Sequence, residues 1–152
     1  MDRRAAADGE SAAPGPLPLS ATSLALVWVG GTVGTAARYL TGRAVPHLLG
    51  VPVATLAVNL LGALALGLLL ERLGTRRARL RLLLGTGFLG GFTTYSALAL
   101  DTVLLARSGL SGPAVGYAAA TLLLGAVASV VGVAVAGRLS GRHHSGGGAQ
   151  PG

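Results

Sequence analysis

Polar side chains inside long apolar runs are the residues of this sequence best suited to chemistry. Asn59 follows Thr55 by four positions, so in a helix both side chains lie on one face. The amide offers two N–H donors and the hydroxyl offers one more. Two interpretations are open. The pair forms hydrogen bonds to a neighbouring helix, or it lines the path of an anion that needs donors.

A second polar pattern lies in the last apolar run. Tyr117, Thr121, Gly125 and Ser129 recur every four residues, which places three hydroxyl groups along one slowly drifting helical face. The helix around them carries no charge, so this face must contact protein or water. Hydrogen bonding between helices and a line of donors along an anion path both explain the pattern.

Arg38 is the charged residue set within the first apolar run. Facing lipid would cost an arginine at that depth at least a few kcal/mol. The side chain therefore either extends to the membrane surface or points into a water-filled vestibule, where its charge would attract an anion.

The stretch GTGFLGGFTTYSAL, residues 85–98, interrupts the third apolar run with four glycines. Glycine is a poor helix former, and irregular backbone at membrane depth needs protein or water around it. We expect a helix break at residues 90–94. Its main-chain oxygens would suit a hard cation, and the hydroxyls of Thr94 or Ser96 would suit an anion. The alternative is that the glycines only let another helix approach closely.

Catalytic chemistry has little support. The chain has no cysteine, and its histidines, His47, His143 and His144, fall in a loop and a tail. Ser96 has no histidine or lysine within the apolar runs to act as its base. The GTGFLG segment matches a dinucleotide-binding pattern only loosely and follows no strand. We expect no enzyme activity.

The composition predicts a membrane protein. Of the 152 residues 51% are hydrophobic and 11% are charged, whereas about a quarter of a soluble domain is charged. The net charge of +7 is not arranged in an aromatic-interleaved basic patch, so we expect no nucleic-acid partner. A span needs about 20 apolar residues. Four runs suffice, at residues 22–40, 51–70, 82–106 and 112–136.

The predicted fold is an all-α membrane protein with four transmembrane helices, the third of them broken. The membrane domain covers residues 22–137, between a disordered tail at 1–21 and a flexible tail at 138–152. Two GxxxG pairs, Gly30 with Gly34 and Gly112 with Gly116, would allow close helix packing. That packing lies within one chain, between chains, or both.

Three segments resemble the motifs of the Fluc/CrcB fluoride channel family. They are GGTVGTAARYL, TLAVNLLGALALG and GTGFLGGFTTYSALALDT, in that order. The family pattern reads roughly GG-x-x-GA-x-x-RY, T-L-x-VN-x-x-G and G-x-x-GG-x-TTFS-x-F-x-x-E. The resemblance covers residues 24–137, the whole membrane region.

The resemblance implies an antiparallel dimer with two fluoride pores and a central structural sodium ion, which is not transported. Main-chain carbonyls at the break, those of Gly90 and Thr93, would hold the sodium. Arg38 would lie in the vestibule. The resemblance implies Asn59, Tyr117, Thr121 and Ser129 as pore residues, and Tyr95 stands at one of the family's ring positions. The hydroxyl donors of the break, Thr94 and Ser96, complete the expected pore. The expected function is passive fluoride export across a bacterial plasma membrane.

The sequence departs from the family pattern at three points. Tyr95 and Leu98 stand where the family has two phenylalanines whose ring edges face fluoride. Gly125 replaces a hydroxyl, and Asp101 stands where a glutamate is frequent. Either the pores are altered, or a partner subunit completes them.

Other functions and arrangements stay open. A four-span proton-coupled multidrug exporter would need an acid in the first span, which has none, and a non-transporting assembly protein would leave the donors unexplained. Nine arginines fall on the side of the termini and two, Arg43 and Arg107, on the other, which favours cytoplasmic termini. That bias points to a heterodimer with an oppositely oriented homologue, while a homodimer requires insertion both ways. The nine are Arg3, Arg4, Arg72, Arg76, Arg77, Arg79, Arg81, Arg138 and Arg142.

Overall fold

A computed structural model describes residues 20–45, 52–74 and 77–141, without the side chains of residues 140 and 141. These ranges are helical and contain no strand, which confirms the all-α prediction. The elements are α1 (Ala21–Ala44), α2 (Val53–Leu73), α3 (Ala78–Leu80), the π-helix η1 (Arg81–Leu89), α4 (Gly90–Phe92), α5 (Tyr95–Arg107) and α6 (Ser111–Gly141).

Three helical segments of the described chain are long and apolar enough to cross a membrane. They are Val53–Leu73, Ala78–Arg107 and Ser111–Leu139. Helix α1 has 24 residues, about 36 Å at 1.5 Å each, but it is less apolar, so its crossing stays a prediction. Large apolar side chains are widely exposed, for example Trp28 at 73% and Val130 at 69%. Such a surface fits lipid, and the prediction of an all-α membrane protein is confirmed.

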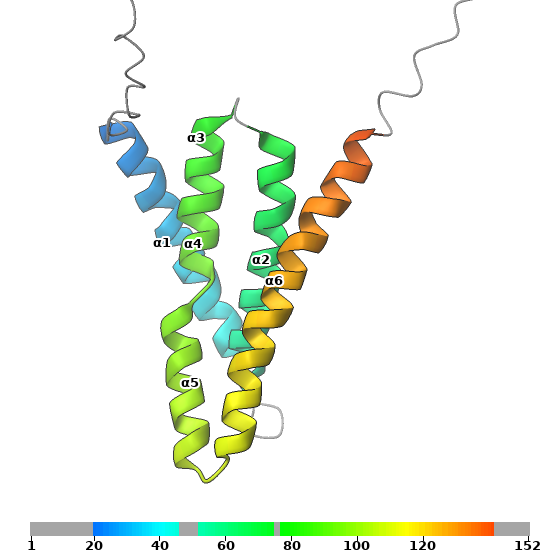
Figure 1. The fold of residues 1–152 in the computed structure, drawn as a ribbon. Helices are drawn as coiled ribbons and strands as arrows, with labels where there is room; N and C mark the ends of the chain where they lie inside the picture. The colour runs from blue at the N-terminus through cyan, green and yellow to red at the C-terminus, as the bar shows by residue number, and fades with distance from the viewer. Residues whose placement is uncertain (1–19, 46–51, 75–76, 142–152) are drawn as a thin grey trace, which may run out of the picture.

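The helices form a bundle that opens toward one end (Figure 1). Helix α2 packs along α6, α1 packs against η1 and α4, and α5 packs against the first half of α6. The start of α1 and the end of α6 lie at the same end of the bundle as the end of α2 and as α3 (Figure 1). The turn between α5 and α6 lies at the opposite end. This arrangement matches an even number of membrane crossings.

Glycines allow α1 to touch the backbone of the third span. A Cβ on Gly30 would overlap the Leu83 carbonyl, and one on Gly34 would overlap the Phe88 carbonyl. On the other side of this contact, a Cβ on Gly87 would lie 3.0 Å from the Val27 carbonyl. The Gly30–Gly34 pair therefore packs within one chain. By contrast, Gly112 and Gly116 would each carry a Cβ with nothing within 4 Å in this chain.

The contact between α2 and α6 is equally close. A Cβ on Gly67 would overlap the Ser129 carbonyl, and one on Gly132 would overlap the Leu64 carbonyl. Helices that pack without a hydrophobic driving force gain from such short backbone distances.

Two predicted boundaries differ from the structure. Helix α6 continues past Ala136 to Gly141, so residues 138–141 belong to a helix and not to the predicted flexible tail. Helix α1 begins at Ala21, inside the predicted N-terminal tail, with Ser20 as its N-cap. The rest of both predicted tails, and also His47, His143 and His144, lie outside the described residues.

Candidate functional site

The third span breaks at two residues. Thr93 (φ −75°, ψ 159°) and Thr94 (φ −152°, ψ 125°) are extended, between the end of α4 and the start of α5. The predicted break is confirmed, but it is narrower than residues 90–94. Gly90 and the two residues after it are still helical, so the expectation of irregular backbone from Gly90 onward is wrong. The reason is that Gly90 (φ −63°, ψ −36°) keeps a helical hydrogen bond to Gly85.

A π-helix precedes the break, which the sequence analysis did not anticipate. Over η1 the turns widen, and the Gly90 N–H donates to the carbonyls of Gly85 and Gly87. Such wide turns are rare and occur mainly at functional sites. The glycines here pack against the glycine face of α1, where the Cβ of a larger residue at Gly87 would lie 3.0 Å from the Gly30 Cα.

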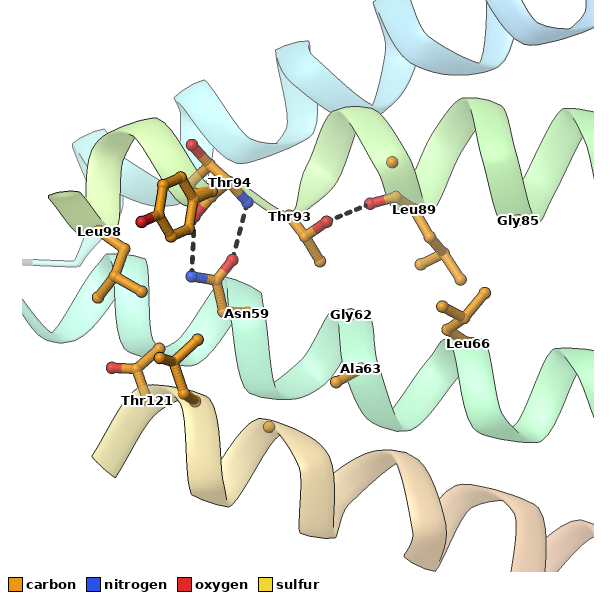
Figure 2. A pocket seen from close by; sticks show the side chains of 14 residues that line it. Asn59, Gly62, Ala63, Leu66, Gly85, Leu89, Thr93, Thr94, Leu98 and Thr121 are labelled. Atoms are coloured by element: carbon orange, nitrogen blue, oxygen red, sulfur yellow. Dashed lines mark hydrogen bonds between the residues drawn. The ribbon is translucent and has the colours of Figure 1, made fainter. Parts of the chain in front are cut away.

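Asn59, in α2, forms hydrogen bonds to the backbone of the break. Its Nδ2 donates to the Thr94 carbonyl at 3.0 Å, and its Oδ1 accepts from the Thr94 N–H at 2.8 Å (Figure 2). One amide thus replaces both main-chain partners of a residue that lies outside any helix. One of the two N–H donors of Asn59 is used in this way, and one remains.

Thr94 also begins the next helix. Its Oγ1 accepts from the Ala97 N–H at 3.1 Å, which is the usual N-cap bond. The same hydroxyl is 3.2 Å from the Ser96 hydroxyl, close enough for a hydrogen bond. Two of the predicted donors, Thr94 and Ser96, are therefore next to each other at the start of α5.

Arg38 reaches the break from α1. Its Nε donates to the Gly91 carbonyl at 3.2 Å, and the Thr35 hydroxyl donates to the same oxygen at 3.4 Å. Arg38 is half-buried. Thr35 was not among the predicted site residues, although its spacing of three from Arg38 places both on one helical face.

Three carbonyls at the break, those of Gly90, Phe92 and Thr93, accept no hydrogen bond within the described ranges. In an unbroken helix the Thr94 N–H would bond to Gly90 and the Ala97 N–H to Thr93. Here these donors bond to Asn59 Oδ1 and Thr94 Oγ1 instead. The carbonyls of Gly90 and Thr93 are left free for another partner.

A cavity of about 360 Å³ lies beside the break, between α2, the third span and α6 (Figure 2). It brings together six of the predicted site residues, and it also includes Leu98, Gly125 and the small residues Gly62 and Ala63. The six are Asn59, Gly90, Thr93, Thr94, Tyr95 and Thr121. Gly62 has a packing role that the sequence analysis missed, because a Cβ there would overlap the Thr93 methyl group.

The two ring positions of the family pattern differ sharply in exposure. Tyr95 is 77% exposed in the single chain, whereas Leu98 is only 4% exposed. Both line the cavity beside the break. A surface as open as that of Tyr95 is free to contact another chain or lipid.

Arg38 and Thr94 line a second cavity, of about 450 Å³, on the α1 side of the break. Thr55 and Arg43 also contribute to its wall. Thr94 borders both cavities, so the break separates them.

Three of the predicted pore residues lie away from the first cavity. Tyr117 is buried, and its hydroxyl donates to the Pro52 carbonyl at 3.3 Å and contacts Asp101 Oδ2 at 3.5 Å. Ser129 lies where α6 packs on Gly67 of α2. Ser96 is exposed at the start of α5. Of the four residues in the polar pattern of the last span, Thr121 and Gly125 line the cavity, and Tyr117 and Ser129 do not. The pattern therefore does not form one continuous line of hydroxyls along the cavity.

These features define a class: a small multi-pass membrane protein in which a broken helix brings polar side chains and free carbonyls to the middle of the bundle. The sequence pattern described as "CrcB-like protein, Camphor Resistance (CrcB)" matches residues 25–133, most of the chain. The chain belongs to this family, the Fluc/CrcB family that the motifs indicated.

Curated relatives are similar over most of both chains. "Fluoride-specific ion channel FluC 2" of Leifsonia xyli subsp. xyli is 46% identical over 126 residues, covering 79% of this chain and 87% of the relative. "Fluoride-specific ion channel FluC" of Paracoccus denitrificans is 45% identical over 114 residues, covering 72% and 90%. "Fluoride-specific ion channel FluC 2" of Rhodococcus jostii is 44% identical over 107 residues, covering 70% and 92%. Together with the apolar helices, this similarity identifies a multi-pass bacterial membrane protein.

Proposed function

We propose that this protein is a fluoride-selective channel that lets fluoride leave the cell passively. The observation that carries the proposal is the convergence of Asn59, Thr94 and Thr121 on one cavity beside the break. The names of the relatives described above, all fluoride-specific ion channels, support the choice of ion.

The chemistry of the cavity suits a small anion. Fluoride holds its water strongly, so a path for it needs donors that replace that water. The second N–H of Asn59 and the hydroxyls of Thr94 and Thr121 are such donors. None of the 14 residues that line the cavity is acidic, so no carboxylate repels an anion there.

Some of these donors have partners in the single chain. The Thr121 hydroxyl donates to the Tyr117 carbonyl of its own helix at 2.8 Å, and Thr121 is 3% exposed. Its hydroxyl must rotate away from that carbonyl to meet fluoride. Rotation of a hydroxyl is easy, and a charge-assisted bond to an anion is about twice as strong as a neutral one.

The remaining predicted pore residues extend this path. Ser96 would add a hydroxyl beside Thr94, while Tyr117 and Ser129 would continue the line of hydroxyls along α6. The ring edge of Tyr95 is electropositive and would face the anion from an exposed position. Leu98 offers no ring, so a second aromatic contact would have to come from a partner subunit.

We further propose that a structural sodium ion binds at the break. The carbonyls of Gly90 and Thr93, which no donor within the described ranges occupies, would hold it. Main-chain oxygens are the ligands that a hard cation prefers, and broken helices supply them in transporters. The sodium would neutralise these carbonyl dipoles and contribute to assembly, and it would not be transported.

Assembly as an antiparallel dimer is part of the proposal. Gly90 is exposed in the single chain, so carbonyls from two copies of the break can meet at one point. The arginine bias between the two ends of the bundle favours a heterodimer with a homologue of opposite orientation, and a homodimer is the alternative. In either assembly Arg38 would give the vestibule at the second cavity a fixed positive charge.

Rescue of a fluoride-sensitive bacterium tests the proposal in cells. A strain that lacks its own fluoride channel should grow in millimolar fluoride when it expresses this chain, or this chain with its oppositely oriented homologue. The matched control is the Asn59→Asp variant at equal membrane abundance, which should not rescue. A lack of rescue by the wild-type chain in either combination would contradict the proposal.

The exporter alternative predicts a different phenotype. Proton-coupled exchange would need an acid in the first span, and α1 contains no aspartate or glutamate. If expression protected cells from organic cations and left their fluoride sensitivity unchanged, the exporter interpretation would replace the channel. Protection from neither would favour an assembly role.

A further inference from the structure

Helix α1 supplies the hydrogen-bond donors that the third span loses at its break. In an unbroken helix the Gly91 carbonyl would accept from the Tyr95 N–H. The extended backbone at Thr93 and Thr94 prevents this, and within the described ranges no main-chain N–H bonds to Gly91. A half-buried carbonyl in the middle of a membrane bundle would then lack a partner, which costs free energy.

Close packing brings α1 to this carbonyl. A Cβ on Gly91 would overlap the Gly31 carbonyl and lie 3.0 Å from the Gly31 Cα, so the two backbones touch. Thr35 and Arg38 follow Gly31 at spacings of four and seven, on the same face of α1. The Thr35 hydroxyl and the Arg38 Nε both donate to the Gly91 carbonyl, at 3.4 Å and 3.2 Å.

We propose that Arg38 and Thr35 are positioning residues that cap the Gly91 carbonyl and fix the break. The Arg38 side chain then has two separable properties. Its Nε–H holds the break, whereas its charge borders the 450 Å³ cavity. Thr35 stands where the Fluc/CrcB pattern GG-x-x-GA-x-x-RY has alanine, so its hydroxyl is a donor that this pattern lacks. The inference concerns the backbone and does not depend on which ion the protein passes.

Two substitutions of Arg38 separate the hydrogen bond from the charge. In Arg38→Gln the side-chain amide nitrogen stands at the position of Nε, so a donor remains and the charge is lost. In Arg38→Met a methyl group takes that position, so both are lost. If Arg38 acts by positioning the backbone, Arg38→Gln should behave like the wild type and Arg38→Met should not. If Arg38 acts only through its charge, both variants should be equally impaired.

Hydrogen–deuterium exchange on the full chain in detergent micelles measures the result. Peptides that cover residues 85–98 report the amides at and beside the break. We expect Arg38→Met to speed their exchange by roughly fivefold or more, because the half-buried Gly91 carbonyl loses the shorter of its two hydrogen bonds. Arg38→Gln should stay within about twofold of wild type. Similar rates for the Gln and Met variants, or a Met variant equal to wild type, would overturn the proposal.

Thr35 provides an independent arm with a matched control. Thr35→Val keeps the side-chain shape and removes the donor to Gly91, so it should speed exchange at residues 85–98. Thr32→Val removes a hydroxyl whose one partner in the described part of the chain is the Trp28 carbonyl of its own helix, at 2.9 Å, so exchange at residues 85–98 should stay unchanged. Because Arg38 and Thr35 share one acceptor, combining Thr35→Val with Arg38→Met should have more than the summed effect. Equal behaviour of the Thr35 and Thr32 variants would refute the cap even if Arg38→Met could not be purified.

Discussion

Asn59 uses both ends of its side-chain amide on the main chain of a single residue, Thr94. This contact fixes the break and, because it occupies the Thr94 N–H, it also leaves the Gly90 carbonyl free. One of its N–H groups is not needed for the contact and can face the cavity. The same side chain can therefore brace the backbone and present a donor to an anion.

Exchanging this amide for a carboxylate separates the two roles. Asn59→Asp replaces a donor by an acceptor and adds a negative charge, which repels an anion 4 Å away by about 4 kcal/mol at an effective dielectric constant of 20. We expect fluoride flux through purified, monodisperse protein to fall by at least about a hundredfold. Asn59→Ala loses the brace without adding charge and should retain more flux than Asn59→Asp. Normal fluoride flux through Asn59→Asp would show that Asn59 has a packing role only and does not contact the anion.

At the scale of the elements, glycines decide which helices touch. Helix α1 meets the third span through Gly30 and Gly34, and the contact reaches the main chain of Phe88. The close approach of α1 is also what carries Arg38 to the break. Packing and site geometry are thus set by the same small residues.

A pair of substitutions within α1 tests this contact. A Cβ on Gly34 would lie 2.9 Å from the Phe92 nitrogen and overlap the Phe88 carbonyl, whereas one on Gly42 would meet nothing within 4 Å. We expect Gly34→Ala to destabilise the protein by about 3 kcal/mol, because backbone atoms cannot move aside easily. Gly42→Ala should change stability by less than about 1 kcal/mol. Thermal unfolding in detergent gives both values, and equal midpoints would contradict the packing described here.

The break could be predicted from the local composition of the third span. The contacts that hold the break could not, because they join residues far apart in the sequence. Glycines and hydroxyl residues within residues 85–98 indicate an interruption without knowledge of the fold. The Asn59 amide and its Thr94 partner are 35 residues apart, so only the packed structure shows that they meet. The same holds for Thr35 and Gly91, which are 56 residues apart. The π-helix gave no signal in the sequence, because its wide turns depend on the contact with α1 as much as on its own glycines.

At the scale of the whole molecule, Gly90 beside the break is exposed in the single chain. Substitution of Gly90 tests whether a second subunit covers this surface. Gly90 is helical, and a Cβ there would meet only the Gly85 carbonyl, at 4.0 Å, so Gly90→Ala should leave a single chain folded. In an antiparallel dimer joined by sodium at this point, the added methyl group should crowd the centre. Thr93→Ser is the control, since its carbonyl remains.

Thermal unfolding in sodium, compared with a large organic cation, measures this. A bound ion stabilises by about 2.7 kcal/mol at 100 times its dissociation constant. We expect a higher midpoint in sodium for the wild type and Thr93→Ser, and little or no shift for Gly90→Ala. A wild-type midpoint that ignores sodium would remove the structural cation from the account.

Orientation is the second property of the whole molecule that can be measured. The described arginines at the end of α2, at α3 and at the end of α6 lie at the end of the bundle where α1 starts (Figure 1). Arg43 and Arg107 lie in the last turns of α1 and α5, toward the other end. We expect this bias to hold both termini in the cytoplasm. C-terminal reporter fusions, one active only inside the cell and one only outside, should give signal from the inside reporter alone. Comparable signals from both would indicate insertion in two orientations and would favour a homodimer.

Ion flux from liposomes measures directly whether this protein passes fluoride and rejects chloride. Purified protein, with its homologue if one is required, is reconstituted in vesicles that contain fluoride and chloride together, and release of each ion is followed by its own electrode. Rejection of chloride by about 3 kcal/mol would give a preference of roughly a hundredfold. We therefore expect rapid fluoride release with chloride retained, and almost no fluoride release from vesicles with Asn59→Asp. Equal release of both anions, or no release from properly folded wild-type protein, would contradict the account.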